Sequence, residues 1–168
     1  MITLKISEAT KKLQDRLHCL QYLATHTVEV GLTSSASARS RTLLAIHEHG
    51  APEMHIPARP VVKPALVQAS TRAAMSAAML SACAAANSGD QAGVTHALED
   101  AGKAGVDGIH AYIDKGILPP NSSITLSGGW MRNPVSKKPV KVKGKSGTTP
   151  LVDTGQLYND FDWEINGK

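Results

Sequence analysis

The first 32 residues show a helical pattern of hydrophobic positions followed by a strand-like one. Leucines recur at intervals of four and three residues, at Leu13, Leu17 and Leu20. This spacing places them on one face of a helix, for which Ser7 is a suitable N-cap, and the helix is expected to end near Leu23. Apolar and polar residues then alternate over residues 26–32, which predicts a half-buried strand.

Residues 33–60 are predicted to form a loop, a short helix and an extended segment. Small polar residues at 33–38 predict the loop, and 42–49 predict a short helix that ends at Gly50. Prolines recur in the ten residues after that helix, at Pro52, Pro57 and Pro60. Because the residue before a proline is biased away from the helical region, residues 51–60 are predicted to be extended.

Two long helices are predicted next. The first, rich in alanine, is expected to begin near Pro60 and to tolerate Pro64 in its first turn. Its inward face is expected to carry residues that recur every four positions: Val67, Thr71, Met75, Met79 and Cys83. Asp90 is a suitable cap for the second helix. Its inward stripe is expected to be Leu98, Ala101, Gly105, Ile109 and Tyr112.

Three glycines interrupt this second helix, at Gly102, Gly105 and Gly108. Each weakens a helix by about 1 kcal/mol relative to alanine, or else lets another part of the backbone approach closely. The sequence leaves both explanations open.

The last third of the chain changes character. Residues 118–150 hold no Asp or Glu and are rich in Pro, Gly, Ser and Lys, which predicts a long loop or a protruding hairpin. A turn is expected at Asp153, Thr154 and Gly155, and a final strand at 158–165. The pattern as a whole predicts an α+β fold. We expect several helices, one of them long and alanine-rich, packed on a small and mostly antiparallel sheet, with a long basic loop or hairpin.

Composition supports one soluble domain over residues 1–168 with a basic arm at about 119–150. Aromatic residues make up 4% of the chain, so the core must rely on aliphatic residues and alanine. Cys19 and Cys83 show no disulfide or metal spacing and are expected to be reduced and at least half buried. We find no secretory signal and no apolar stretch long enough to span a bilayer.

No catalytic, metal or cofactor site is expected from the residue pattern. His47, Glu48 and His49 lie near His55, but alternate residues on a helix point to different faces, and the spacing of a zinc protease is absent. The segment 144–147 lacks the glycine spacing of a phosphate-binding loop. The serines lack the context of an activated nucleophile. We therefore expect a protein that is not an enzyme.

The marked electrostatic feature is the basic arm. Six of the 18 basic residues fall in its acid-free stretch: Arg132, Lys137, Lys138, Lys141, Lys143 and Lys145. The remaining 12 basic residues face 14 acidic ones, so a slightly acidic body carries one basic arm. Such an arm suits DNA phosphates or an acidic surface of a neighbouring subunit. It also suits a solvated hairpin whose lysines discourage edge aggregation. Trp130 is the one aromatic residue of the arm, which favours a protein partner, because single-strand binders usually interleave several aromatics.

Three sequence blocks resemble a known family. Residues 46–50 (IHEHG) with 56–60 (IPARP) resemble the "IHEFG…IPARPF" signature of phage tail-completion and neck proteins, which are related to minor tail protein Z and tail-terminator-type connectors. Residues 116–122 (GILPPNS) resemble that family's "G…PPLSP" element, and 150–157 (PLVDTGQL) its "PLIDTGQL". The matching residues with an expected structural role are His47, Glu48, Gly50, Pro57, Arg59, Pro60, Pro119, Pro120, Asp153, Thr154 and Gly155.

The resemblance implies a structural virion protein. Such a subunit would form a ring, by this resemblance a hexamer, at the head-proximal end of the tail, and would contact neighbouring neck, connector and tail-tube proteins. It would be assembled in the host cytoplasm. Three positions stay open: the end of the tail tube, the portal-side connector, and a role in assembly alone. Arg59 is expected to bind an acid or a backbone carbonyl. The alternatives are a small nucleic-acid-binding accessory protein and, more remotely, a hydrolase of virion morphogenesis.

Overall fold

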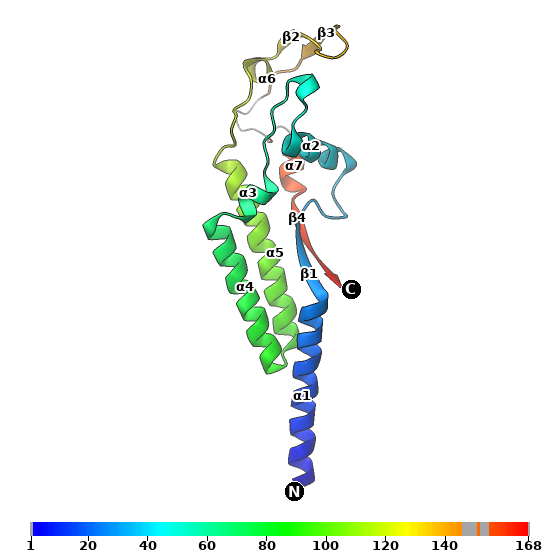
Figure 1. Ribbon diagram of the computed structural model, residues 1–168, viewed down its shortest axis with the longest axis vertical. Helices are drawn as coiled ribbons and strands as arrows, with labels where there is room; N and C mark the ends of the chain where they lie inside the picture. The colour runs from blue at the N-terminus through cyan, green and yellow to red at the C-terminus, as the bar shows by residue number, and fades with distance from the viewer. Residues whose placement is uncertain (1, 146–150, 152–154, 168) are drawn as a thin grey trace.

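The computed structural model describes residues 2–145, 151 and 155–167 (Figure 1). These residues form helices and two small antiparallel sheets, which confirms the predicted α+β class. The elements in chain order are α1 (Ile2–Thr25), β1 (His26–Gly31), α2 (Ala38–His49), the 3-10 turn η1 (Pro52–Met54), α3 (Val62–Leu66), α4 (Ala69–Ser88), α5 (Gln91–Asp114), α6 (Ser123–Ser127), β2 (Gly129–Arg132), β3 (Pro139–Val142), α7 (Gln156–Asn159) and β4 (Asp162–Gly167).

The helices α4 and α5 lie side by side as an antiparallel pair (Figure 1). Gly89 ends α4 with a φ of 80°, a left-handed conformation that glycine adopts without steric cost. The predicted cap of α5 is confirmed, because a carboxylate oxygen of Asp90 accepts a hydrogen bond of 2.9 Å from the N–H of Gly93. The predicted stripe of α5 is also confirmed, since Leu98, Ala101, Gly105 and Ile109 are buried and Tyr112 is partly buried against the core.

Two clusters of buried side chains lie on this pair. One surrounds the upper half of α5 and includes Val61, Ala65, Ile109, Ile113, Leu157 and Phe161. The other lies where α1 meets the lower halves of α4 and α5, and includes Cys19, Ala82, Ala86, Val94, Ala97 and Leu98. Aliphatic residues and alanine thus dominate both clusters, as the low aromatic content predicts.

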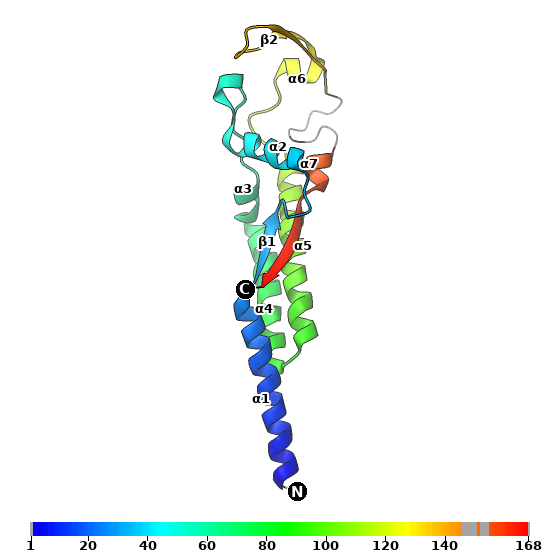
Figure 2. The same cartoon turned by 90° about the vertical axis from the view of Figure 1, so that its right-hand side faces the viewer.

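The strands β1 and β4 form an antiparallel sheet that lies against α5 (Figure 2). The strand predicted at 26–32 is confirmed. The strand predicted at 158–165 begins later than expected: Tyr158 lies in the single helical turn α7, and β4 starts at Asp162. Gly155, with a φ of 79°, lets the chain enter that turn.

Two of the three glycines singled out in α5, Gly102 and Gly105, are explained by this sheet, whereas Gly108 faces Thr71 of α4. A Cβ atom at Gly102 would lie 2.6 Å from Cδ2 of the Trp163 ring on β4. A Cβ atom at Gly105 would lie 2.8 Å from a methyl group of Val30 on β1. The glycines therefore admit side chains of the sheet and of α4, rather than the neighbouring backbone that was the predicted alternative.

The helix α1 differs from the prediction at both ends and in the surface it buries. It begins at Ile2 rather than at a Ser7 cap, and it continues to Thr25. Leu13, Leu17 and Leu20 lie on one face, but these residues are 66%, 56% and 42% exposed, respectively. The side that contacts the rest of the chain carries Cys19, Tyr22 and Leu23 instead. The first half of α1 extends past the α4–α5 pair (Figure 1).

The predicted alanine-rich helix is divided in two. Gln68 has extended dihedral angles (φ −56°, ψ 139°) and separates α3 from α4. Pro64 lies in the first turn of α3, as predicted. The predicted inward face of α4 is wrong apart from Thr71 and the partly buried Met75. Its buried residues are Thr71, Ala82 and Ala86, because small side chains let α4 approach α5 closely.

As a result, the large apolar residues of this region face outward. Val67, Met79 and Leu80 are 57%, 41% and 72% exposed. Cys83 is exposed as well, so the prediction of two buried or half-buried cysteines holds for Cys19 alone.

The helix predicted at 42–49 begins earlier, at Ala38. Ser37 caps it, with the side-chain oxygen accepting a hydrogen bond of 3.1 Å from the N–H of Ser40. Asp160, the residue after α7, accepts a hydrogen bond from the N–H of Ser37 and so holds the start of α2 against the end of α7. Hydrogen bonds from the Ser40 hydroxyl and from Ser37 lower the pKa of Asp160, and partial burial opposes this shift. Residues 51–60 are only partly extended, because η1 and an antiparallel bridge between Ala51 and Ile56 fold the first half into a compact loop.

Candidate interaction surface

Within the described part of the predicted basic arm, α6 is followed by a β-hairpin of β2 and β3 at the end of the molecule farthest from the N-terminus (Figure 1). Residues 146–150 of the predicted arm lie outside the described residues. In β2 and β3, Trp130 faces Lys141 and Met131 faces Val140. Asn133 shapes the connection: its side-chain oxygen accepts hydrogen bonds from the N–H groups of Val135 and Ser136, at 2.9 and 2.8 Å. Of the two predicted forms, loop or hairpin, the structure has the hairpin.

The root of the hairpin is narrow and held by backbone contacts. Gly128 has a φ of 70°, and a Cβ atom there would lie 2.6 Å from the backbone nitrogen of Gly144. Across the same gap the N–H of Lys145 donates a 3.0 Å hydrogen bond to the carbonyl of Thr125 in α6. Two glycines thus allow the two chain segments to pass close together before the hairpin opens.

The basic residues of the arm divide into structural and outward-facing ones. Arg132 donates a hydrogen bond of 2.8 Å from Nε to the carbonyl of Lys137, and the Lys137 ammonium group bonds the carbonyl of Pro134. These two therefore stabilise the hairpin turn. Lys138, Lys141 and Lys143 are exposed, and their side chains have no hydrogen-bond or ion-pair partner among the described residues.

The hairpin also exposes apolar side chains. Trp130 is 69% exposed and Val135 at the tip is 59% exposed. Because Trp130 and Lys141 are cross-strand partners, their side chains leave the hairpin on the same face, and both residues are exposed. Such a pairing can contact either an acidic protein surface or nucleotide bases and phosphates.

The segment that leads to the hairpin is held by Arg59. Its Nε donates to the carbonyl oxygen of Pro119 at 2.7 Å, and a terminal nitrogen donates to that of Pro120 at 3.0 Å. The side chain is only 6% exposed. The backbone N–H of Arg59 also donates to the carbonyl of His47. Of the expected partners for Arg59, an acid or a carbonyl, the structure has the carbonyls.

Glu48 joins α2 to α3. One carboxylate oxygen accepts hydrogen bonds from the N–H groups of Val61 and Val62, at 2.7 and 2.9 Å. These are N–H groups at the start of α3, which have no partner within the helix. The sequence singled out Glu48 only as part of a motif, because a cap supplied from 13 residues upstream leaves no local signal. Gly50 has a φ of 73° and turns the chain toward Ala58, as its expected role at the end of α2 requires.

His47 lies on α2 and faces a pocket at the hairpin root. It lines an open pocket of mixed polar and apolar character together with Arg39, Leu43, Thr125, Lys143 and Gln156. Burial, and then the positive charges of Arg59 and Lys145, lower the pKa of His47. Its buried Nδ1 has no hydrogen-bond partner among the described residues. Of the third sequence block, Gly155 lies at the start of α7, whereas Asp153 and Thr154 lie outside the described residues.

The remaining candidates for chemistry stay apart. Within residues 2–145, 151 and 155–167 no three His, Cys, Asp or Glu side chains are grouped as metal ligands. His110 bonds the carbonyl of Tyr158 at 2.9 Å and stacks on its ring. None of the described helices is long and apolar enough to cross a membrane.

Comparisons with known proteins add no relative. No protein-family model, no curated protein and no solved structure matches the chain.

Proposed function

We propose that this chain is a structural subunit of a tailed-phage virion. In this role it completes or terminates the tail and joins it to the head-side neck as one member of a ring. The proposed partners are further copies of the chain, in a hexamer, and the neighbouring neck, connector and tail-tube proteins. The chain is proposed to act by assembly and not as an enzyme.

One observation carries this proposal: the exposed basic hairpin is held out on a narrow, well-anchored root at one end of an elongated molecule (Figure 2). A projection of this kind reaches a surface beyond its own subunit. Three lysine side chains with no partner among the described residues suit an acidic surface.

Two of the sequence blocks also meet in space. Arg59, from the first block, bonds the carbonyls of Pro119 and Pro120, from the second. Glu48, from the first block as well, caps α3. Contacts of this type fix the path of the backbone up to the hairpin, which is the expected role of such blocks in a protein that works through its shape.

Particle size and hairpin charge test the proposal together. The purified chain should form a closed ring, seen as a single large species by light scattering and as a ring by electron microscopy. Replacing Lys138, Lys141 and Lys143 by glutamate should leave the chain folded and abolish binding to the partner neck or tail-tube protein. A matched control replaces Lys11, Lys12 and Lys115, which are exposed outside the hairpin. A chain that stays monomeric at all concentrations would exclude the ring.

A second function is favoured by a specific observation, the Trp130–Lys141 pair. In this alternative the hairpin binds nucleic acid, and the chain is a small accessory protein. Binding of a duplex or single strand should then weaken steeply as salt rises, because lysine–phosphate contacts release counterions. A monomer that binds DNA tightly at low salt, and loses binding in the triple lysine variant, would support this alternative over the first.

A further inference from the structure

One face of α1 forms an exposed leucine seam, which we define as Leu13, Leu17, Leu20 and Ala24. These positions follow intervals of four, three and four residues, which is the spacing of a coiled-coil seam. All four residues are exposed. Cys19 packs against Ala82 and Ala86 of α4, and Asp15 lies beside Gly89 at the end of α4. Because successive residues of a helix are 100° apart, the seam lies on the opposite side of α1 from Asp15 and Cys19. The described part of the chain therefore leaves the seam uncovered.

A second uncovered surface is the outer face of α4, defined as Ala73, Ser76, Ala77, Leu80 and Ala84. All five residues are exposed, and Leu80 is 72% exposed. Arg72 is the only charged residue among the 20 residues of α4. A helix face in contact with water normally carries charged residues, so this face has the composition of a buried one.

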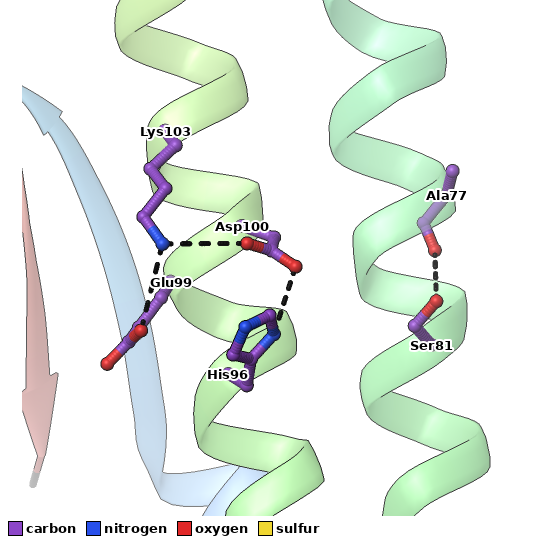
Figure 3. A network of polar contacts seen from close by, with 6 residues as sticks. All are labelled: Ala77, Ser81, His96, Glu99, Asp100 and Lys103. Atoms are coloured by element: carbon purple, nitrogen blue, oxygen red, sulfur yellow. Dashed lines mark hydrogen bonds and ion pairs between the residues drawn. The ribbon is translucent and has the colours of Figure 1, made fainter.

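The neighbouring helix shows the contrast. Along α5, Lys103 lies 3.8 Å from Glu99 and 3.6 Å from Asp100, and Asp100 lies 3.1 Å from His96 (Figure 3). The polar contact drawn on α4 in the same view is internal, from the Ser81 hydroxyl to the carbonyl of Ala77. Thus α5 has a surface built for water, whereas α4 does not.

The two uncovered faces complement each other. The seam presents large leucine side chains, and α4 presents small ones with a single leucine between them, so leucine knobs can enter spaces between alanines. The residues beside the seam on one flank, Gln14 and Gln21, are uncharged, so burying that flank removes no charge from water. From Leu13 to Ala24 the seam is about 16 Å long, and from Ala69 to Ser88 α4 is about 29 Å long, which is enough to receive it.

We propose that the leucine seam of α1 binds the outer face of α4 in a second copy of this chain. One such contact covers both faces, whereas pairing of two α1 helices would leave α4 uncovered. In Figure 1, α4 lies at the left edge of the molecule and the free half of α1 extends below the α4–α5 pair. The seam lies opposite the side of α1 that contacts α4, so the two faces cannot meet within one chain. A contact between different faces repeats head to tail from copy to copy and closes into a ring when the rotation allows.

This inference rests on the proposed function, since it names the contact that builds the ring. Two single substitutions test it. Leu17→Glu places a charge in the seam and Leu80→Glu a charge on α4, and each should convert the assembly into a monomer of 17.7 kDa. Because both side chains are more than half exposed, circular dichroism and the melting temperature should stay those of the wild type. Leu118→Glu, at a leucine that is 80% exposed outside both faces, is the matched control and should assemble normally.

Mixing the two variants identifies the partners. Leu17→Glu protein retains an intact α4 face and Leu80→Glu protein an intact seam, so an equimolar mixture should form a one-to-one dimer and nothing larger. Sedimentation velocity measures this directly. If Leu80→Glu alone assembles like the wild type while Leu17→Glu does not, α1 pairs with α1 and the inference is wrong.

The other outcomes separate this inference from the function it rests on. If both variants form the same rings as the wild type, the α1–α4 contact is wrong and the ring proposal stands. A wild-type chain that stays monomeric at every concentration would overturn both.

Discussion

Arg59 Nε lies 2.7 Å from the carbonyl oxygen of Pro119, which is 60 residues further along the chain. The second hydrogen bond of the same guanidinium, to Pro120, makes this a two-point attachment. It ties the segment after α2 to the segment that leads into the hairpin. The contact therefore fixes where the hairpin leaves the body of the molecule.

Replacement of Arg59 should destabilise the fold. Arg59→Met keeps the aliphatic stem but removes both donors, and the two carbonyls then need other partners. We expect the free energy of unfolding, measured by urea denaturation, to fall by about 1.5–3 kcal/mol. Arg59→Lys should recover only part of this, because one ammonium group cannot reproduce the planar fork. The control Arg72→Met, at an exposed site, should change stability by no more than roughly 0.5 kcal/mol.

Glu48 gives a second prediction. Glu48→Ala leaves the N–H groups of Val61 and Val62 without their acceptor, and should lower the free energy of unfolding by about 1–2 kcal/mol. Glu48→Gln keeps an oxygen acceptor and should lose less. Equal losses in the two variants would show that the negative charge, and not the acceptor geometry, stabilises the start of α3.

Gly102→Ala is expected to lower stability, although the same substitution in a helix usually raises it. At an exposed helical site, glycine to alanine stabilises by about 1 kcal/mol. At Gly102 the new methyl group would meet the Trp163 ring, so Gly102→Ala should instead destabilise by about 1–3 kcal/mol. The double variant Gly102→Ala, Trp163→Ala should show strong coupling between the two sites in a double-mutant cycle. A stabilised Gly102→Ala variant would mean that β4 does not rest on this helix.

His47 predicts a dependence of stability on pH. Its pKa in the folded chain is below the usual 6.5, mainly because of burial. As the pH falls below 6.5, the unfolded chain takes up a proton that the folded chain resists. The contribution of His47 to stability is thus complete above pH 6.5 and is lost progressively below it. In His47→Gln the fall of the unfolding free energy between neutral and acidic pH should become shallower, while the control His18→Gln, at an exposed site on α1, should keep the wild-type slope.

The sequence predicted those parts of the fold that depend on local pattern. Alternating residues indicated β1, the Asp90 cap and the apolar stripe indicated α5, and the acid-free stretch indicated a loop or a hairpin. The division between α3 and α4 was missed, since Gln68 is not a helix breaker and carries no signal of its own.

At the candidate site, the charges and the motif residues could be identified from the sequence, but their contacts could not. The basic residues of the arm appeared as one set, although Arg132 and Lys137 are engaged in the hairpin turn and Lys138, Lys141 and Lys143 face outward. A hydrogen bond to a backbone carbonyl depends on which segments meet, so no residue pattern could separate these roles.

By itself, the sequence determined which positions are apolar, that Asp90 caps a helix, and where the positive charge collects. Only the tertiary structure decided which apolar faces are buried. Leu13, Leu17 and Leu20 have the periodicity of a core face and yet point away from the chain. The alanines Ala82 and Ala86 occupy the core instead. Periodicity places residues on a common face, but the face that is buried depends on how closely two helices can approach, and in α4 and α5 the smallest side chains allow the closest contact.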